Sequence, residues 1–160
     1  MKGKRTDLGD SQCGIARSLQ VVGDWWTLLI VRDAFKGKVR FGEFQKSLGL
    51  AKNILSTRLK KLVDQGVFRI EADPDAPASH RYLLTPKGEK LGITLVALWQ
   101  WGEEHCFAPG ELAYQLVDQS SAEPIARLHL ETTGGKSVEA HGFRVGPRPG
   151  TRAGAQSRLP

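Results

Sequence analysis

Short polar side chains and basic side chains share one stretch of the chain, between residues 52 and 61. Amide and hydroxyl groups can read the edges of DNA bases, whereas lysine and arginine hold phosphates. The predicted base-reading residues are Asn53, Ser56 and Thr57. The other predicted DNA-binding residues are basic, and they are Arg40, Lys52, Lys60, Lys61, His80 and Arg81. The chemistry expected of these side chains is recognition of a nucleic acid.

A merely solvated helix face could carry the same polar residues, so the local charge balance matters. Residues 36–61 contain eight lysine and arginine side chains but only one acidic side chain, Glu43. A face that is merely soluble mixes both signs of charge. The excess favours a polyanionic partner, and the net charge of +6 and the pI near 9.5 agree with this interpretation.

Two helices and a turn would position these side chains. Residues 41–66 predict two short helices separated at Gly49, with Gly66 ending the second one, because glycine adopts a positive φ at low cost. The apolar positions of the second helix repeat at the helical period and should face a core; they are Leu55, Leu59, Leu62 and Val63. This pattern is the outline of a helix-turn-helix.

A hairpin is predicted directly after the second helix. Residues 67–72 and 80–85 are the expected strands, and the loop between them, DPDAPAS, has turn-forming residues that cannot belong to a central strand. Such a hairpin would be a wing carrying His80 and Arg81 toward DNA. Alternatively, Arg69 and Arg81 pair across the hairpin with Glu71 or Asp73.

Two helices are predicted before this region. The first should begin at a cap on Asp10 or Ser11 and run to about residue 22. Asp24 should cap the next helix, WWTLLIVRDAF, whose nearly continuous apolar surface predicts burial. Trp25 and Trp26 are expected in the core or at a subunit contact rather than stacked on bases.

One long helix is predicted after the hairpin. Thr85 should be its N-cap and Pro86 its first helical residue, and it should run to about Cys106. Its apolar surface is larger than one small domain would bury, which indicates a partner. A second copy of the chain is expected, since a dimer presents two recognition helices to successive major grooves about 34 Å apart.

Several blocks stand in a characteristic order along the chain. They are Cys13-Gly-Ile-Ala-Arg-Ser-Leu, Gly23-Asp-Trp-Trp-Thr-Leu-Leu-Ile, Arg40-Phe-Gly-Glu-Phe, Ile54-Leu-Ser-Thr-Arg-Leu-Lys-Lys-Leu, Gly66, Tyr82-Leu-Leu-Thr-Pro-Lys-Gly and Trp101-Gly. Together they resemble the HxlR-type transcriptional regulators, which are related to the MarR group. The resemblance implies a winged helix-turn-helix of α+β class, mainly α, with added N- and C-terminal dimerisation helices and with residues 50–65 in the major groove.

Cys13 is a candidate redox sensor. Many members of the resembled family carry an N-terminal cysteine at this position, and in some of them it senses oxidants or electrophiles. A thiol in the first turn of a helix would have its thiolate favoured by the helix dipole, whereas Asp10 would oppose this effect. The alternative is a small buried core residue. Cys106 beside His105 has no second Cys/His pair nearby, so no metal site is predicted.

The 160 residues are long enough for one well-buried domain and an appendage. The expected parts are a flexible basic arm over residues 1–10, a DNA-binding and dimerisation domain over 11–107, a small β-rich appendage over 108–145 and a disordered tail over 146–160. Within the appendage, residues 112–117 and 125–130 alternate like strands, residues 136–145 could add a third, and Gly134-Gly135 should form a turn.

The predicted function is a sequence-specific transcriptional regulator, a cytoplasmic homodimeric repressor that binds double-stranded DNA and responds to a small molecule or an oxidant. Neither an apolar run near 18 residues nor a signal peptide is seen, so no membrane partner is expected. No cofactor and no enzymatic activity are expected, because the sequence has no phosphate-binding glycine loop, no metal cluster and no nucleophile with a histidine partner. The alternative is a winged-helix module that binds an acidic protein.

Overall fold

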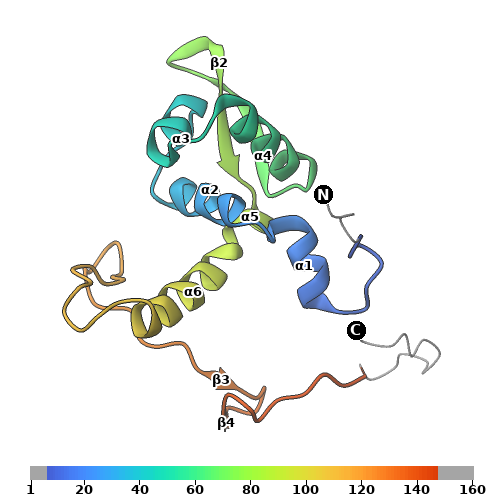
Figure 1. The fold of residues 1–160 in the computed structure, drawn as a ribbon, viewed down its shortest axis with the longest axis vertical. Helices are drawn as coiled ribbons and strands as arrows, with labels where there is room; N and C mark the ends of the chain where they lie inside the picture. The colour runs from blue at the N-terminus through green and yellow to red at the C-terminus, as the bar shows by residue number, and fades with distance from the viewer. Residues whose placement is uncertain (1–6, 148–160) are drawn as a thin grey trace. The chain divides into compact units, whose positions relative to one another are not determined.

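The computed structural model describes residues 7–147, so most of the predicted arm and tail lies outside the described residues (Figure 1). The described residues divide into two units, with the boundary between residues 95 and 96. The elements in chain order are α1 (Gly14–Val22), α2 (Trp25–Phe35), α3 (Phe41–Leu48), α4 (Lys52–Asp64), β1 (Phe68–Asp73), β2 (Ala76–Leu84), α5 (Pro86–Glu89), α6 (Leu91–His105), β3 (Leu130–Glu131) and β4 (Ser137–Val138).

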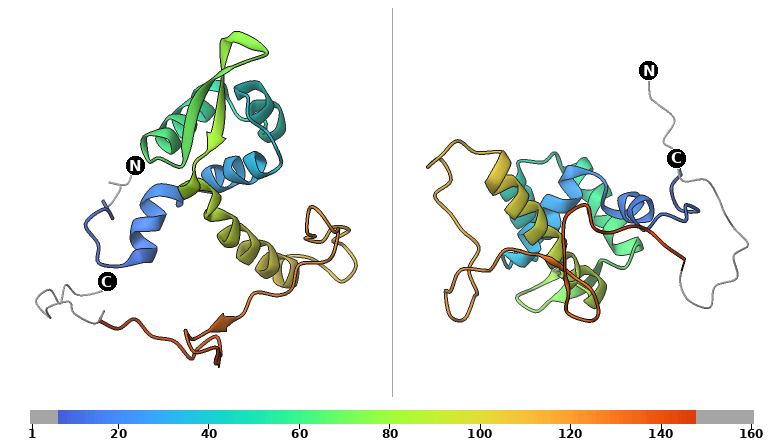
Figure 2. Two further views of the ribbon diagram at one scale, coloured as in Figure 1. Left: turned by 180° about the vertical axis from the view of Figure 1, so that it is seen from behind. Right: turned by 90° about the horizontal axis from the view of Figure 1, so that it is seen from below.

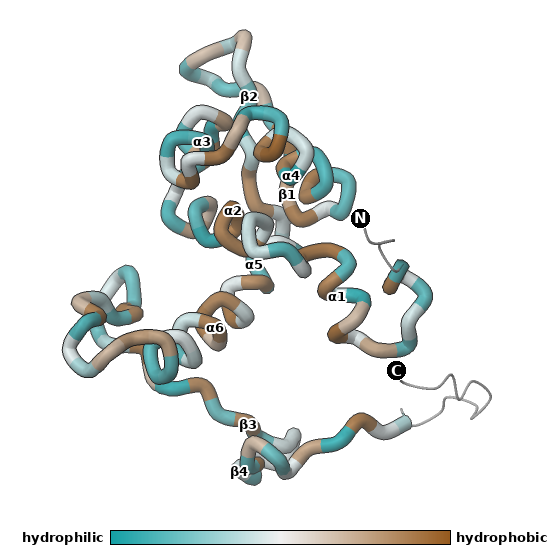
Figure 3. Tube along the Cα trace, viewed as in Figure 1, coloured by the Kyte–Doolittle hydropathy of each residue, from teal (hydrophilic) through white to brown (hydrophobic). Residues whose placement is uncertain are grey.

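The core of the first unit joins α2, α3 and α4 to the start of the hairpin. Its buried hydrophobic side chains are Ile30, Val31, Phe44, Leu50, Leu55, Leu59, Leu62, Val67 and Phe68. The rings of Phe44 and Phe68 meet edge to face with their centroids 6.3 Å apart. Figure 3 shows the hydrophobic residues of α2 and α4 along this packing. The burial of one leucine face of α4 leaves its opposite face toward solvent.

The predicted helix-turn-helix is confirmed. Gly49 follows α3 with a φ of 63°, and Gly66 follows α4 with a φ of 66°, so both glycines adopt the left-handed conformation that ends a helix. The predicted cap of α2 is confirmed as well. The Asp24 carboxylate accepts hydrogen bonds from the Thr27 amide at 3.1 Å and from the Thr27 hydroxyl at 2.8 Å.

The predicted wing is present, but its loop is shorter than expected. β1 and β2 pair antiparallel, and the hairpin projects beyond α3 and α4 (Figure 2). The strand β2 begins at Ala76 and includes Pro77, so the prediction of a loop through residue 79 is wrong. The strand register shifts between Ala72 and Asp73. This irregularity places Pro77 where no regular ladder hydrogen bond is required of it.

The wing is joined to the helix-turn-helix by the residues that precede α3. The Tyr82 amide of β2 donates to the Val39 carbonyl at 2.7 Å, and Arg40 forms an antiparallel bridge with Arg81. A third short segment therefore pairs with β2 and fixes the position of the hairpin beside α3.

The first helix differs from the prediction at its start, and the second differs in the burial of its first residue. Cys13, not Asp10 or Ser11, is the N-cap of α1, and the Ser11 hydroxyl instead accepts a hydrogen bond from the Cys13 amide at 3.1 Å. The burial predicted for α2 holds for its inner side but not for Trp25, which is 75% exposed. Trp25 lies in the first turn, where α2 leaves the core.

The single helix predicted after the hairpin is divided into α5 and α6 at Lys90. Thr85 caps α5 as predicted, since its hydroxyl accepts from the Gly88 amide at 3.2 Å. Glycines stand on both sides of the division. A Cβ on Gly88 would lie 2.3 Å from the Val67 carbonyl oxygen, and one on Gly92 would lie 3.2 Å from the Phe35 ring. The close approach of the Val67 carbonyl and the Phe35 ring, together with the conformational freedom of the two glycines, accounts for the interruption of the helix.

The second unit contains most of α6 and the chain that follows it, and it has less sheet than predicted. β3 and β4 form one short antiparallel pair. Residues 112–117 and 125–130 are not strands, apart from Leu130 in β3 and an isolated bridge between Val117 and Pro124. Within residues 96–147, these alternating segments have no strand partner longer than the two-residue strands β3 and β4. The turn predicted at Gly134-Gly135 is confirmed, with Gly135 at a φ of 78°.

Candidate nucleic-acid interface

The exposed face of α4 carries the predicted base-reading residues. Asn53, Ser56 and Thr57 are all exposed, whereas the three leucines of the helix are fully buried beneath them. The Thr57 hydroxyl donates to the Asn53 carbonyl at 2.8 Å, so its oxygen remains able to accept a hydrogen bond from a base. The three residues therefore lie together on the solvent side of one helix.

The N-terminus of α4 is open to an anion. Ala51 is its N-cap and offers no side chain to accept the first amides of the helix, and the first turn holds no acidic residue. Lys52 is exposed at the same end. The positive end of the helix dipole and a lysine thus occur together beside the base-reading residues, as phosphate binding requires.

Two other lysines of α4 have partners inside the protein. Lys60 pairs with Asp64 at 2.6 Å on the exposed face. The ammonium group of Lys61 donates to the Gln20 carbonyl at 2.6 Å, which connects α4 to α1. Lys61 is thus close to the predicted site in sequence, but its ammonium group binds the last turn of α1, where a positive charge stabilises the free carbonyls of the helix end.

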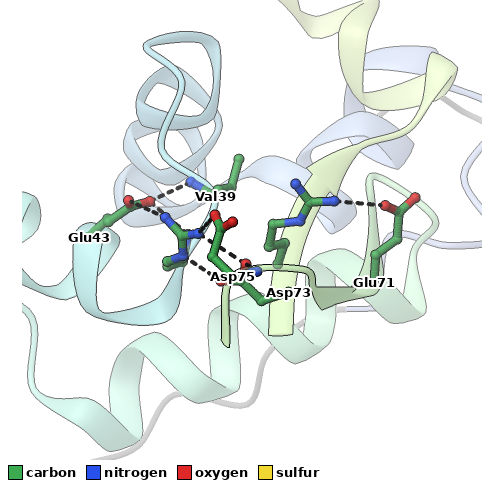
Figure 4. Close-up of polar contacts among 7 residues, drawn as sticks. Val39, Glu43, Glu71, Asp73 and Asp75 are labelled. Carbon is green, nitrogen blue, oxygen red and sulfur yellow. Dashed lines mark hydrogen bonds and ion pairs between the residues drawn. The ribbon is translucent and has the colours of Figure 1, made fainter. Parts of the chain in front are cut away.

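Arg40 forms ion pairs with Asp73 and Asp75 at the turn of the wing, and Figure 4 labels both of these carboxylates. Its guanidinium donates to both oxygens of Asp73 and to Asp75 at 2.8 Å, and the Asp73 side chain is fully buried. Glu43 accepts from the Arg40 and Val39 amides, each at 2.8 Å. The hydrogen bond from Arg40 lowers the pKa of Asp73, and the two amides lower the pKa of Glu43.

The basic residues of the wing also have internal partners. Arg69 pairs with Glu71 at 2.8 Å, and Arg81 approaches the same carboxylate at 3.5 Å. The hydrogen bond from Arg69 lowers the pKa of Glu71. The alternative prediction of pairing across the hairpin is confirmed for Arg81, which reaches Glu71 from the opposite strand, whereas Arg69 pairs with Glu71 within β1. His80 is exposed on β2.

A cluster of lysines near α3 was not among the predicted site residues. Lys36, Lys38 and Lys46 line a shallow surface hollow of about 480 Å³ together with Ser47. Glu43 also borders the hollow, but both of its oxygens face the amides that precede α3. These lysines belong to the basic run of residues 36–61, so the charge excess was the signal that could have found them. We call them the α3 lysine cluster.

An ion pair inside the first unit joins α4 to α2. Arg58 lies 3.3 Å from the Asp24 carboxylate that caps α2, and both side chains are about four-fifths buried. The buried Nε of Arg58 has no partner within residues 7–147. Sequence reasoning missed this pair because 34 positions separate its members. It fixes the rotation of α4 against α2.

Cys13 lies at the N-cap of α1 and is partly exposed. The prediction placed it within the first turn, and the structure moves it one position earlier. Cys106 is exposed just after α6. Among the described residues there is no group of three His, Cys, Asp or Glu side chains that could hold a metal ion.

Large apolar side chains remain exposed on the helices that were predicted to contact a partner. In the first unit they are Ile15, Leu19, Trp25 and Ile93, with exposed fractions of 52–75%. In the second unit, α6 exposes Leu98 and Trp101, at 48% and 60%. No helix within residues 7–147 is both long and apolar enough to cross a membrane.

A helix-turn-helix followed by a paired hairpin, with short polar residues exposed on the second helix of the motif, defines a winged-helix DNA-binding protein. A sequence model of the HxlR-like helix-turn-helix matches residues 21–109. The chain belongs to the HxlR-like helix-turn-helix family of DNA-binding transcriptional regulators, which confirms the family that the sequence blocks resemble.

Three relatives illustrate how far the similarity extends. The HTH-type transcriptional regulator Rv3095 of Mycobacterium tuberculosis is 36% identical over 87% of this chain and 88% of its own length. The crystal structure of PA1607, a candidate transcription factor, is 46% identical and covers 89% of this chain and all of its own, with a TM-score of 0.83. The redox regulator HypR, in its reduced form, is 26% identical over 59% of this chain and 94% of its own, with a TM-score of 0.52.

Proposed function

We propose that the chain is a homodimeric, sequence-specific repressor that acts in the cytoplasm by occluding a promoter. The observation that carries this proposal is the pairing of exposed Asn53, Ser56 and Thr57 with the fully buried leucine face of α4. Burial fixes which side of the helix faces outward, and that side holds short hydrogen-bonding groups suited to base edges.

The basic residues divide into two proposed roles. Lys52 and the α3 lysine cluster hold phosphates on either side of the base contacts, and Lys60 does so in exchange for its exposed pair with Asp64. Arg40, Lys61 and Arg81 have partners within the protein, and they position the wing and α4. His80 is exposed, and its side chain forms no hydrogen bond or ion pair within residues 7–147. It is the wing residue proposed to reach the DNA backbone.

The proposed dimer is supported by the exposed apolar side chains of α1, α2 and α6. Large exposed apolar side chains of this kind are typical of contact sites. Two copies related by a twofold axis would present two α4 helices to successive major grooves, about 34 Å apart. The operator should then contain two inverted half-sites.

The proposed repressor responds to an oxidant through Cys13 or to a small molecule. The position of Cys13 on α1, one of the proposed dimer helices, and its partial exposure support the first form. HypR is a redox regulator. Treatment with diamide should change DNA affinity in wild type and in Cys106→Ser but not in Cys13→Ser; equal responses in both variants would exclude Cys13.

A response to a small molecule is supported by a hollow of about 220 Å³ between Arg17, Val21, Val67 and Leu91.

The proposal is tested by selecting duplexes from a random library with the full chain. The selected DNA should share inverted half-sites whose centres lie one helical turn, about 10 base pairs, or a multiple of it apart. Thr57→Ala should select a different or weaker consensus, while Thr132→Ala, at the β-turn of the second unit, should select the same one. Recovery of no common sequence by the wild type would contradict the proposal and favour the protein-binding alternative.

A further inference from the structure

The chain after α6 has a defined path but no core of its own. None of the side chains of residues 106–147 is buried, and only Leu112, Leu116 and Val138 are even partly covered. Figure 3 shows hydrophobic residues recurring along the segment. The large apolar side chains exposed in it are Phe107, Tyr114, Val117, Ile125, Leu128, Leu130, Phe143 and Val145. We call residues 108–147 the extension.

The extension is attached to α6 by a specific set of contacts. The side-chain amide of Gln100, which is 9% exposed, donates to the Ala126 carbonyl at 2.9 Å and accepts from the Leu128 amide at 2.8 Å. Arg127, between them, donates to the Gln100 carbonyl at 2.9 Å and pairs with Glu103 at 3.3 Å. A helical side chain thus pairs with the extension backbone as a neighbouring strand would.

These contacts hold the extension but cannot order it alone. Fixing the backbone of one residue costs more free energy than a typical hydrogen bond returns. The extension is some forty residues long, whereas its contacts with α6 cluster around three of them. The missing contribution must come from burial of its apolar side chains against another surface.

The charge of the extension argues against DNA as that surface. It contains five acidic residues against three basic ones, a formal charge of −2, whereas the helix-turn-helix region is strongly basic. The acidic residues are Glu111, Asp118, Glu123, Glu131 and Glu139, and the basic ones are Arg127, Lys136 and Arg144. This charge balance disfavours contact between the extension and a phosphate backbone.

The position of the attachment indicates a second copy of the chain. Gln100 holds Leu128 beside the segment of α6 that also exposes Leu98 and Trp101, so the apolar surface of the extension continues that of α6. In a twofold dimer, one patch can cover the corresponding patch of the partner.

Only some relatives share the extension. The family match ends at residue 109, but PA1607 and Rv3095 match 89% and 87% of the chain, so their similarity must continue into the extension. HypR is almost fully covered by 59% of this chain. The extension is therefore a feature of one group of these regulators.

We infer that the extension is a dimerisation strap, which α6 holds by Gln100 and Arg127 and which packs its apolar side chains on a second copy of the chain. This inference rests on the homodimer of the proposed function and assigns part of its interface to residues that the helix-turn-helix family match does not include.

The first test places a photo-crosslinking amino acid in the full-length chain at Tyr114, which is 76% exposed, and, as a control, at Ser120 in an exposed polar turn. Mixtures of two differently tagged copies are irradiated. The Tyr114 probe should give a covalent species of twice the 17.6 kDa chain mass that carries both tags, and the Ser120 probe should not. Crosslinking of Tyr114 only within its own chain, or none at all, would overturn the inference.

The second test compares Arg127→Glu with Arg144→Glu by sedimentation equilibrium. Arg127→Glu sets a new carboxylate against Glu103 and should raise the dimer dissociation constant by about tenfold or more, whereas Arg144→Glu, the same charge change elsewhere in the extension, should alter it less than about twofold. Equal dimer dissociation constants for the two variants would overturn the inference that the extension is a dimerisation strap. If both variants also bind operator DNA like the wild type, the proposed repressor function stands without the strap. A monomeric wild type that binds no DNA would refute both the strap and the proposed function.

Discussion

Asp24 should be more important for stability than its place just before α2 suggests, because its carboxylate performs two tasks. It caps α2 through Thr27, at 3.1 Å and 2.8 Å, and it pairs with Arg58 of α4 at 3.3 Å. Replacing an N-cap aspartate by alanine costs typically about 1 kcal/mol. A hydrogen bond to a charged group contributes about 1.5–3 kcal/mol when it is shielded from water.

The two side chains of the pair are only 18% and 20% exposed, so solvent screens them less than a surface pair. We therefore expect Asp24→Ala to lower the free energy of unfolding by about 2–4 kcal/mol. Asp24→Asn keeps an acceptor for the cap but loses the charge, and it should cost about 1–2 kcal/mol. Urea denaturation at one fixed protein concentration measures both, since dimerisation makes stability depend on concentration.

A double-mutant cycle with Arg58→Ala separates the ion pair from the cap. The coupling energy between Asp24→Ala and Arg58→Ala should be about 1–2 kcal/mol, because the residues are in contact. Arg58→Ala should also weaken binding to the selected operator, since the pair sets the rotation of α4. Additivity within about 0.3 kcal/mol, or equal effects of Asp24→Ala and Asp24→Asn, would refute the two roles assigned here.

Three further predictions concern the wing, a helix end and the lysine cluster. The pKa of Asp73 is lowered in the folded state by Arg40, so the pair stabilises the protein above the unfolded-state pKa, near 3.9, and this contribution is lost as the pH falls through the folded-state value; the melting temperature of Asp73→Asn should therefore lie below that of wild type at pH 7 and converge with it in acid. Gly66→Ala should lower the free energy of unfolding by about 1–2 kcal/mol, because φ is 66° and alanine is strained there. Lys38→Ala should weaken specific and random DNA alike and reduce the salt slope by about one unit.

Each of these predictions has a control and a contradicting result. A gap between wild type and Asp73→Asn that is constant with pH would mean that the ionised carboxylate contributes nothing. Gly14→Ala, at an unhindered helical position, should be neutral or stabilising, so equal losses at both glycines would dismiss the conformational argument. An unchanged salt slope in Lys38→Ala would remove the α3 lysine cluster from the DNA interface.

The helix-turn-helix could be predicted from sequence because its signals are local. Gly49 and Gly66 end their helices through their own conformational freedom, and the leucines of α4 repeat within a single helix. The wing could be predicted because a strand pattern, turn-forming residues and a second strand pattern succeed one another. The bounds of its turn could not be predicted, because the register shift beside Asp73 depends on the partner strand.

The engagement of the basic side chains could not be predicted, because their partners are distant in sequence. Arg40 reaches Asp73 over 33 positions, and Lys61 reaches Gln20 over 41. The positive charge of Arg40 and Lys61, taken without these partners, predicted that both residues contact phosphates. The strands predicted in the extension are absent because a local pattern was read without its surroundings. Residues 112–117 and 125–130 alternate as strands do, but such alternation specifies a sheet only where a partner strand or a core is present.

The central claim, that the outer face of α4 reads DNA sequence, is tested most directly by fluorescence anisotropy across a salt series. The protein should bind the DNA upstream of its own gene, or the selected operator, about a thousandfold or more tightly than a scrambled duplex at physiological salt. Thr57→Ala should lose affinity for the specific duplex while its affinity for the scrambled one stays unchanged. Equal and steeply salt-dependent binding of the wild type to the selected and scrambled duplexes would contradict the claim.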